Sequence, residues 1–280
     1  MNNYTKEIEK IPFGKGVEVV SINEDGLIAL EKPAGLMSHP NCAKDEKYSL
    51  INARYDLMGE FYIWKNEDGS ESKAWLLNRL DSATSGLLLL TLNEALKPII
   101  TDLFLRHKVF KGYYAIVRGT TKQSMGIWEN TFQKVTKTRT GSRKGIKSIK
   151  AKTKFQKVRS VTGGFPMSLM KLFPITGRTH QLRIQCRKNK LPICGDKTYG
   201  SFRFNRDVKS ETGIDRLLLH SFSISFEYFY DNKRVSFTAQ SEMPAIFEGL
   251  LSYRPGMDFE KLFPKLLQGK TTLKGRRFNA

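Results

Sequence analysis

Short apolar runs and alternating apolar and polar positions dominate this chain, and both patterns are typical of strands. Residues 86–93 (GLLLLTLN) form a continuous apolar run of strand length, which predicts a central strand covered on both faces. Residues 112–119 (GYYAIVRG) predict another strand, with Tyr113 and Tyr114 on opposite faces, one toward the core and one toward a cleft. Similar patterns predict further strands at 16–33 (two strands around an Asn-Glu-Asp-Gly turn), from Lys150, from Met167, and at 217–230 and 233–240, a hairpin around Asp231 and Asn232.

Two segments carry apolar residues at helical spacing. Residues 94–109 predict a helix capped by Asn93, and residues 177–189 (GRTHQLRIQCRKN) predict the start of a second helix. On that second helix Arg178 and Gln181 would share one stripe. Because strands outnumber helices, the predicted fold class is α+β, with a mixed, mainly antiparallel central sheet flanked by helices.

The charge of the chain is large and uneven. The formal net charge is +20, and residues 130–195 contain 17 Lys or Arg and no Asp or Glu. Such an acid-free block indicates a polyanionic partner, with nucleic acid favoured over anionic lipid or a merely solvated basic face. Within the block, residues 136–148 (TKTRTGSRKGIKS) are expected to form a basic loop that faces phosphates.

Several classes of protein are disfavoured by the composition. No apolar run reaches the roughly 18–20 residues of a transmembrane helix, and the N-terminus lacks a hydrophobic signal region. The cysteines Cys42, Cys186 and Cys194 have no CxxC pairing, which argues against a disulfide framework and a cysteine zinc site. We therefore expect a cytoplasmic protein that does not bind membranes.

A single carboxylate, Asp81, stands in the segment NRLDSATSG, directly before the buried strand at 86–93. Taken alone, Asp81 is more simply explained as a turn-stabilising residue. The segment GRTHQLRIQ offers an arginine, Arg183, that could hold Asp81 through a bidentate ion pair, or could instead contact phosphate. Whichever of Tyr113 and Tyr114 faces the cleft is a candidate platform for a nucleic-acid base, although most strand tyrosines fill the core.

Together these segments resemble the RluA family of RNA pseudouridine synthases. The family's H-R-L-D-x-x-T-S-G motif is met by NRLDSATSG, which is the most specific match. The order of the matches along the chain agrees with the family, and they cover roughly residues 16–250. The other matching segments are EKPAGLMSHP, KGYYAIVRG, GRTHQLRIQ, ICGDKTYG and LLLHSFSISF.

The resemblance implies a pseudouridine synthase fold with a basic active-site cleft, and isomerisation of specific uridines in RNA. It places the catalytic residues at Asp81, Tyr113 and Arg183, and it implies that the positive charge of Arg183 keeps Asp81 ionised. Whether Asp81 attacks the sugar, attacks the base or removes a sugar proton stays open. The implied substrate-binding residues are Arg79, Leu182, Thr84, Arg178 and Lys32. Arg79 would fill the space that the flipped base vacates or bind the flanking phosphates, and Leu182 would exclude water.

The reaction is redox-neutral, so no cofactor and no metal are expected. Two residues depart from the family pattern: Asn78 replaces a histidine and Ser221 replaces an alanine. The lone His180 is interpreted as structural, and Lys32 as a scaffold or phosphate contact.

The resemblance divides the chain into an N-terminal extension (1–15), a catalytic domain (16–250) and a basic C-terminal tail (251–280), with no separate N-terminal RNA-binding domain. The expected partner is RNA, either tRNA or rRNA and preferably a stem-loop, bound by a monomer. The alternatives are a catalytically silent RNA-binding or ribosome-assembly protein on the same fold, and a DNA-binding protein. DNA is disfavoured because no helix-turn-helix or zinc finger is visible.

Overall fold

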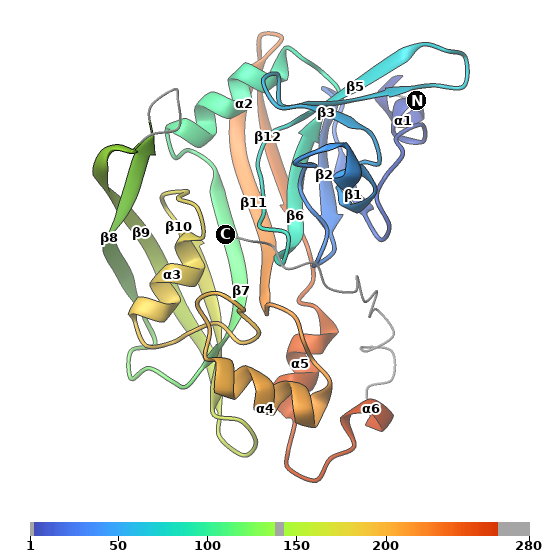
Figure 1. Cartoon of the computed structure of the whole chain (residues 1–280). Coiled ribbons are helices and arrows are strands. Elements are labelled where there is room, and N and C mark those ends of the chain that lie inside the picture. The colour runs from blue at the N-terminus through green and yellow to red at the C-terminus, as the bar shows by residue number, and fades with distance from the viewer. Residues whose placement is uncertain (1–2, 138–142, 263–280) are drawn as a thin grey trace.

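The computed structural model describes residues 3–137 and 143–262, which build one 12-stranded sheet with helices packed on it (Figure 1). The strands are β1 (Glu18–Ile22), β2 (Leu27–Lys32), β3 (Arg54–Asp56), β4 (Phe61–Lys65), β5 (Glu71–Leu76), β6 (Ser85–Thr91), β7 (Phe110–Arg118), β8 (Met125–Lys137), β9 (Arg143–Val161), β10 (Met167–Pro174), β11 (Leu219–Tyr230) and β12 (Lys233–Gln240). The helices are α1 (Asn3–Ile8), a 3-10 helix at Ala43–Tyr48, α2 (Leu96–Leu105), α3 (Gln181–Lys188), α4 (Phe202–Thr212), α5 (Ala245–Ser252) and α6 (Phe259–Leu262).

The main path of the sheet runs β3-β4-β5-β6-β11-β7-β10-β9-β8, with β1 and β2 added beside β6 and β12 beside β11. Strands β1–β6 therefore form one half-sheet and β7–β12 the other. The halves join where β6 runs parallel to β11, through the pairs Ser85–His220 and Gly86–Ser221. All other pairings among the described strands are antiparallel, which confirms the predicted mixed α+β architecture.

Strand β6 is the central, doubly covered strand that its apolar run predicts, since all seven of its residues are buried. Leu87 and Leu89 pack on one face, in a cluster that includes α2. Leu88 and Leu90 pack on the other face, against residues of β2, β4 and β5. Because β6 is buried on both faces, it lies at the centre of the sheet, and the Asp81 segment leads directly into its N-terminal end.

Of two local predictions, one is confirmed and one holds only in part. The predicted helix is present as α2, but it spans Leu96–Leu105 and its N-cap residue is Ala95, without a side-chain cap. The Oδ1 atom of Asn93 instead accepts a hydrogen bond from the backbone N–H of Ala95 (3.1 Å) in the turn before the helix. The hairpin β11–β12 turns at Asp231 and Asn232, whose φ angles of +48° and +56° suit a two-residue turn.

Three features differ from the sequence prediction. Helix α3 begins only at Gln181, because His180 adopts a left-handed φ of +52°, so Arg178 precedes the helix and shares no helical stripe with Gln181. The segment expected as a loop at 136–148 is largely strand, since β8 continues to Lys137 and β9 starts at Arg143; residues 138–142 lie outside the described part. Helix α4 and strands β3–β5 were not anticipated.

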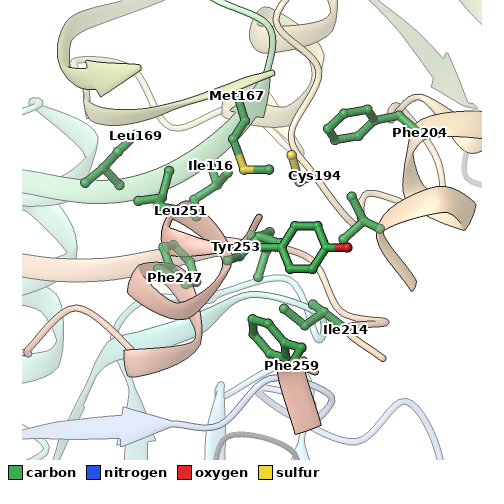
Figure 2. Packing of buried hydrophobic residues seen from close by; sticks show 13 residues of the cluster. Ile116, Met167, Leu169, Cys194, Phe204, Ile214, Phe247, Leu251, Tyr253 and Phe259 are labelled. Carbon is green, nitrogen blue, oxygen red and sulfur yellow. The ribbon is translucent and has the colours of Figure 1, made fainter. Parts of the chain in front are cut away.

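The packed part of the chain extends beyond the predicted limits of 16 and 250. Ile11 is buried and Phe13 packs against the same cluster of β2, β4, β5 and β6 residues. Leu251, Tyr253 and Phe259 are buried with residues of β7, β10 and α5 (Figure 2). The first part of the predicted tail thus belongs to the core, and residues 263–280 lie outside the described part.

No helix within the described ranges is long and apolar enough to cross a membrane.

Candidate active site

Asp81 lies in a tight turn between β5 and β6. The backbone N–H of Thr84 donates to the carbonyl of Asp81 (2.9 Å), which closes the turn. The Oδ1 atom of Asn78 accepts a hydrogen bond from the N–H of Leu89 (2.7 Å). Asn78 can therefore anchor the segment to β6 through its side chain, in place of the histidine of the family motif.

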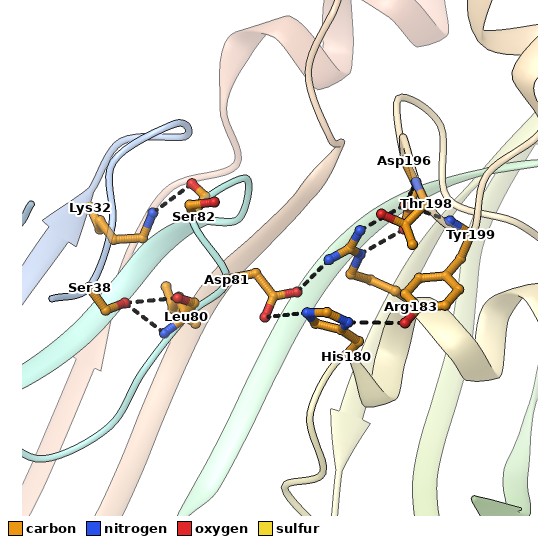
Figure 3. A network of polar contacts seen from close by, with 10 residues as sticks. All are labelled: Lys32, Ser38, Leu80, Asp81, Ser82, His180, Arg183, Asp196, Thr198 and Tyr199. Atoms are coloured by element: carbon orange, nitrogen blue, oxygen red, sulfur yellow. Dashed lines mark hydrogen bonds and ion pairs between the residues drawn. The ribbon is translucent and has the colours of Figure 1, made fainter. Parts of the chain in front are cut away.

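Two buried side chains fix this turn to the segment that follows β2 (Figure 3). The ammonium of Lys32, which is fully buried, donates to the carbonyls of Pro33, Leu36 and Ser82 at 3.0, 2.8 and 3.1 Å. Ser38 donates to the carbonyl of Leu80 (2.8 Å) and accepts from its N–H (3.0 Å). Lys32 therefore stabilises the backbone around Asp81. It is not among the residues that line the cavity described below, so the structure does not support the prediction that Lys32 binds substrate.

Arg183 brings a guanidinium to Asp81 from α3, on the other half of the sheet. Its Nη1 atom lies 2.8 Å from Oδ2 of Asp81. The predicted pairing therefore exists, but it is not the forked pair that was expected. The fork is directed at Asp196: Nε and Nη2 lie 2.8 and 2.9 Å from its two carboxylate oxygens.

The loop that carries Asp196 supports the charged groups around Asp81 (Figure 3). Oδ1 of Asp196 also accepts hydrogen bonds from the N–H groups of Thr198 and Tyr199, both at 2.9 Å. The ring of Tyr199 lies 5.2 Å from the guanidinium carbon of Arg183. The Tyr199 hydroxyl is 3.1 Å from Nδ1 of His180, whose Nε2 lies 3.7 Å from Oδ1 of Asp81.

Burial and charge shift the protonation equilibria of these groups. Burial alone would lower the pKa of Arg183, but Asp196 and Asp81 outweigh it and raise this pKa above its ordinary value. Burial likewise opposes ionisation of Asp196, yet the Arg183 guanidinium and two backbone amides bring its pKa below the ordinary value. Burial raises the pKa of Tyr113 to about 12, with a further contribution from Asp81, so its hydroxyl keeps its proton.

Asp81, Tyr113 and Arg183 line one cavity of about 730 Å³. The side chain of Asp81 is 27% exposed and that of Arg183 only 9%, so the carboxylate is open to a ligand while its cation is shielded. The structure brings seven of the eight predicted site residues to the lining: Arg79, Asp81, Thr84, Tyr113, Arg178, Leu182 and Arg183.

The rim of the cavity is basic. Arg79 is exposed and its Nη1 lies 3.1 Å from Nε2 of His39, whose ring stacks on Tyr55. Arg178 is exposed and donates to the carbonyl of Lys150 (3.3 Å). Both arginines are therefore available to anionic groups at the mouth.

Sequence reasoning missed Asp196, Tyr199, His39 and Lys111 as members of the site. Asp196 and Tyr199 lie in the segment ICGDKTYG, which matched a family motif but whose residues were assigned no role. Among the residues that the structure describes, no three His, Cys, Asp or Glu side chains come together as a metal site.

Comparison with known proteins gives a consistent result. Residues 26–188 match the family model described as RNA pseudouridylate synthase. A tRNA pseudouridine synthase C of Haemophilus ducreyi is 31% identical over 224 residues, covering 77% of this chain and 88% of that protein. An uncharacterized RNA pseudouridine synthase of Haemophilus influenzae is 34% identical over 189 residues, covering 65% and 77%.

The fold is shared with two solved human structures. RNA Pseudouridylate Synthase Domain Containing 1 superposes with a TM-score of 0.55 at 20% identity, covering 86% of this chain and 96% of that one. Domain Containing 4 gives 0.56 at 19% identity, covering 89% and 94%.

Proposed function

Because this chain belongs to the RluA family of RNA pseudouridylate synthases, and is therefore an enzyme that isomerises uridine in RNA, we propose that Asp81 carries out the reaction. The observation that supports this most directly is the open carboxylate of Asp81 beside the shielded guanidinium of Arg183, 2.8 Å apart at one cavity. The same arrangement gives no support to a catalytically silent RNA-binding protein.

The chemistry explains why the pair is needed. The bond between C1′ and N1 of uridine breaks, the uracil turns, and a bond forms between C1′ and C5 while N1 gains a proton and C5 loses one. An ionised carboxylate oxygen can serve as nucleophile at the sugar or base, or as base toward a sugar proton. The Nη1 of Arg183 donates a charge-assisted hydrogen bond to Oδ2 of Asp81, which orients the carboxylate that each route requires.

Tyr113 and Leu182 would enclose the detached base. Leu182 is buried among apolar residues of β7, β8, β9 and β10, and provides a wall that keeps water from the freed sugar. Tyr113 would pack against the uracil, and its protonated hydroxyl can donate to an oxygen or nitrogen of the base. Arg79 and Arg178 would bind flanking phosphates at the rim, and Thr84 lines the floor.

The experiment is release of tritium from RNA that carries [5-³H]uridine, since C5 loses its hydrogen in the reaction. RNA from cells lacking this gene is the substrate. Asp81→Asn should release no tritium while binding this RNA as wild type does. Asp207→Asn, an exposed acid on α4, is the matched control and should keep full activity. Tritium release by Asp81→Asn at the wild-type rate would refute the role of Asp81.

The finer assignments belong to the same proposal. Relatives bear the names tRNA pseudouridine synthase C and ribosomal large subunit pseudouridine synthase C, so both RNA classes are candidates. Mapping pseudouridines in total RNA with and without the gene identifies the target. We further propose that the enzyme acts in the cytoplasm as a monomer and prefers RNA to DNA. Sedimentation and competition with duplex DNA test the last two points.

A further inference from the structure

Lys111 is a cation inside the cavity that the reaction described so far does not use. It opens the segment KGYYAIVRG and lies on β7 two residues before Tyr113. Alternate residues of a strand project from the same face of a sheet, so Lys111 and Tyr113 share a face. Both line the cavity that contains Asp81.

Lys111 differs from the other cavity-lining cations in its partners. Arg183 is paired with Asp81 and Asp196, whereas Arg79 and Arg178 each have a hydrogen-bond partner. Within the described ranges, the Nζ of Lys111 has no hydrogen bond and no ion pair. It lies over the face of the Phe104 ring, 5.7 Å from the ring centre.

An unpaired cation at this depth is unfavourable. Burial lowers the pKa of Lys111, and no neighbouring charge opposes that effect. A ring contact near the outer limit of cation–π geometry compensates only a small part of the lost hydration. Lys32 shows the usual solution in this same protein, because three carbonyls surround its buried ammonium. A cation left without such partners is typical of a site that a ligand completes.

Gly177 lies beside the amine, since a Cβ atom built on it would stand at an ordinary van der Waals distance of 3.9 Å from the Nζ of Lys111. Arg178 follows directly and also lines the cavity. Two basic side chains therefore border one open volume beside the backbone of 177–178.

We propose that Lys111 binds a phosphodiester oxygen of the RNA at the nucleotide being isomerised, inside the cavity and next to the Asp81 site. This rests on the proposed function. The substrate is the source of the anion because uracil and ribose are neutral, and the phosphates are the only formal negative charges that the nucleotide carries.

The test measures how RNA affinity depends on salt in Lys111→Met and Lys111→Arg. Each phosphate contact contributes about 0.7 to the slope of log affinity against log salt for single strands, and about 0.9 for duplexes. The probe is bulk tRNA from cells lacking the gene. Lys111→Met should reduce the slope by about that amount and weaken binding about tenfold. Lys111→Arg should restore both, and KM should rise more than kcat falls.

Lys171→Met is the matched control. Lys171 is a half-exposed lysine on β10, with its Nζ also 5.7 Å from the rings of Tyr114 and Phe222. Its register partner is Tyr114, so it projects from the opposite face of the sheet to Lys111. Its replacement should leave the slope unchanged.

Three results would overturn the proposal. One is an unchanged salt slope in Lys111→Met, with or without a fall in kcat. Another is an equal loss of slope in Lys171→Met. The third is a clear drop in the thermal unfolding midpoint of Lys111→Met, because removing an unpaired buried cation should leave that midpoint unchanged or raise it. A wild-type enzyme that releases no tritium would instead refute the proposed function, while the salt slope would still test Lys111.

Discussion

Replacing Asp196 with asparagine removes one negative charge from beside Arg183 while keeping the size of the side chain. Asp196 is 1% exposed and accepts four hydrogen bonds, two from the guanidinium and two from backbone N–H groups. An asparagine has a single acceptor oxygen, and its amide N–H₂ would face the N–H groups of Arg183. The variant therefore loses part of the support that orients Arg183 toward Asp81.

The size of the effect follows from burial. Breaking one side of a buried, hydrogen-bonded ion pair costs about 3–5 kcal/mol of folding free energy. Arg183 would keep only its single bond to Asp81 and could rotate away from it. Misplacing a catalytic group by about 1 Å lowers turnover by roughly 100-fold. We expect a comparable fall in kcat, with KM for RNA little changed because the rim arginines are untouched.

Two measurements test this. Urea unfolding gives the loss of stability of Asp196→Asn, and tritium release, measured on variant protein that is folded, gives the change in kcat. Asp215→Asn is the matched control, because Asp215 also forms ion pairs, with Lys197 and Lys209, but its side chain is 40% exposed. An exposed pair of this kind contributes about 0–1 kcal/mol. A stability loss in Asp196→Asn no larger than in Asp215→Asn, or a wild-type kcat in the folded variant, would refute the reasoning.

Two further predictions concern the junction of the half-sheets. Gly86→Ala should lower the yield of folded protein and its unfolding midpoint, because Gly86 has a φ of +107° and an added Cβ would stand 2.2 Å from the carbonyl oxygen of Ser221; a midpoint equal to wild type would contradict this. Burial, with the charge of Arg216, lowers the pKa of His220 from 6.5 to about 4, so the unfolded chain binds a proton that the native protein does not, and stability should decrease as the pH falls from about 6.5 to about 4. The free energy of unfolding should fall by about 2 kcal/mol by pH 5 through this residue. In urea unfolding, the stability of His220→Gln should therefore depend less on pH than that of wild type, and identical pH dependences would contradict the prediction.

The parts of the fold that sequence reasoning predicted are those set by local chemistry. The apolar run of β6 can only be buried on both faces, and its burial is complete. Asp and Asn tolerate positive φ angles, so the sequence predicted a two-residue turn at Asp231 and Asn232 between β11 and β12. The helix after Asn93 was likewise indicated by apolar residues at helical spacing, although Asn93 bonds within the preceding turn and does not cap the helix.

The parts that were missed depend on contacts between distant segments. The sequence does not indicate whether Asp81 or Asp196 receives the fork of Arg183, and in the structure the loop amides hold Asp196 in place for it. The burial of Lys32 could not be inferred from its sequence, because its three carbonyl partners come from a turn and from Ser82, 50 residues away. The late start of α3 depends on the left-handed His180, which tertiary contacts with Tyr199 stabilise.

The narrow parallel junction between β6 and β11 has a mechanical consequence. The two half-sheets share only two residue pairs there, one of which involves the tightly enclosed Gly86. Asp81 is carried by one half and Arg183 rests on the other, so the bond between them acts as a brace across the junction. A slight rotation of the halves would change the separation of these two side chains directly. The distance between Asp81 and Arg183 therefore depends on the angle between the two half-sheets. Substitutions at the β6–β11 junction should change the position of the Asp81 carboxylate even though they do not contact it.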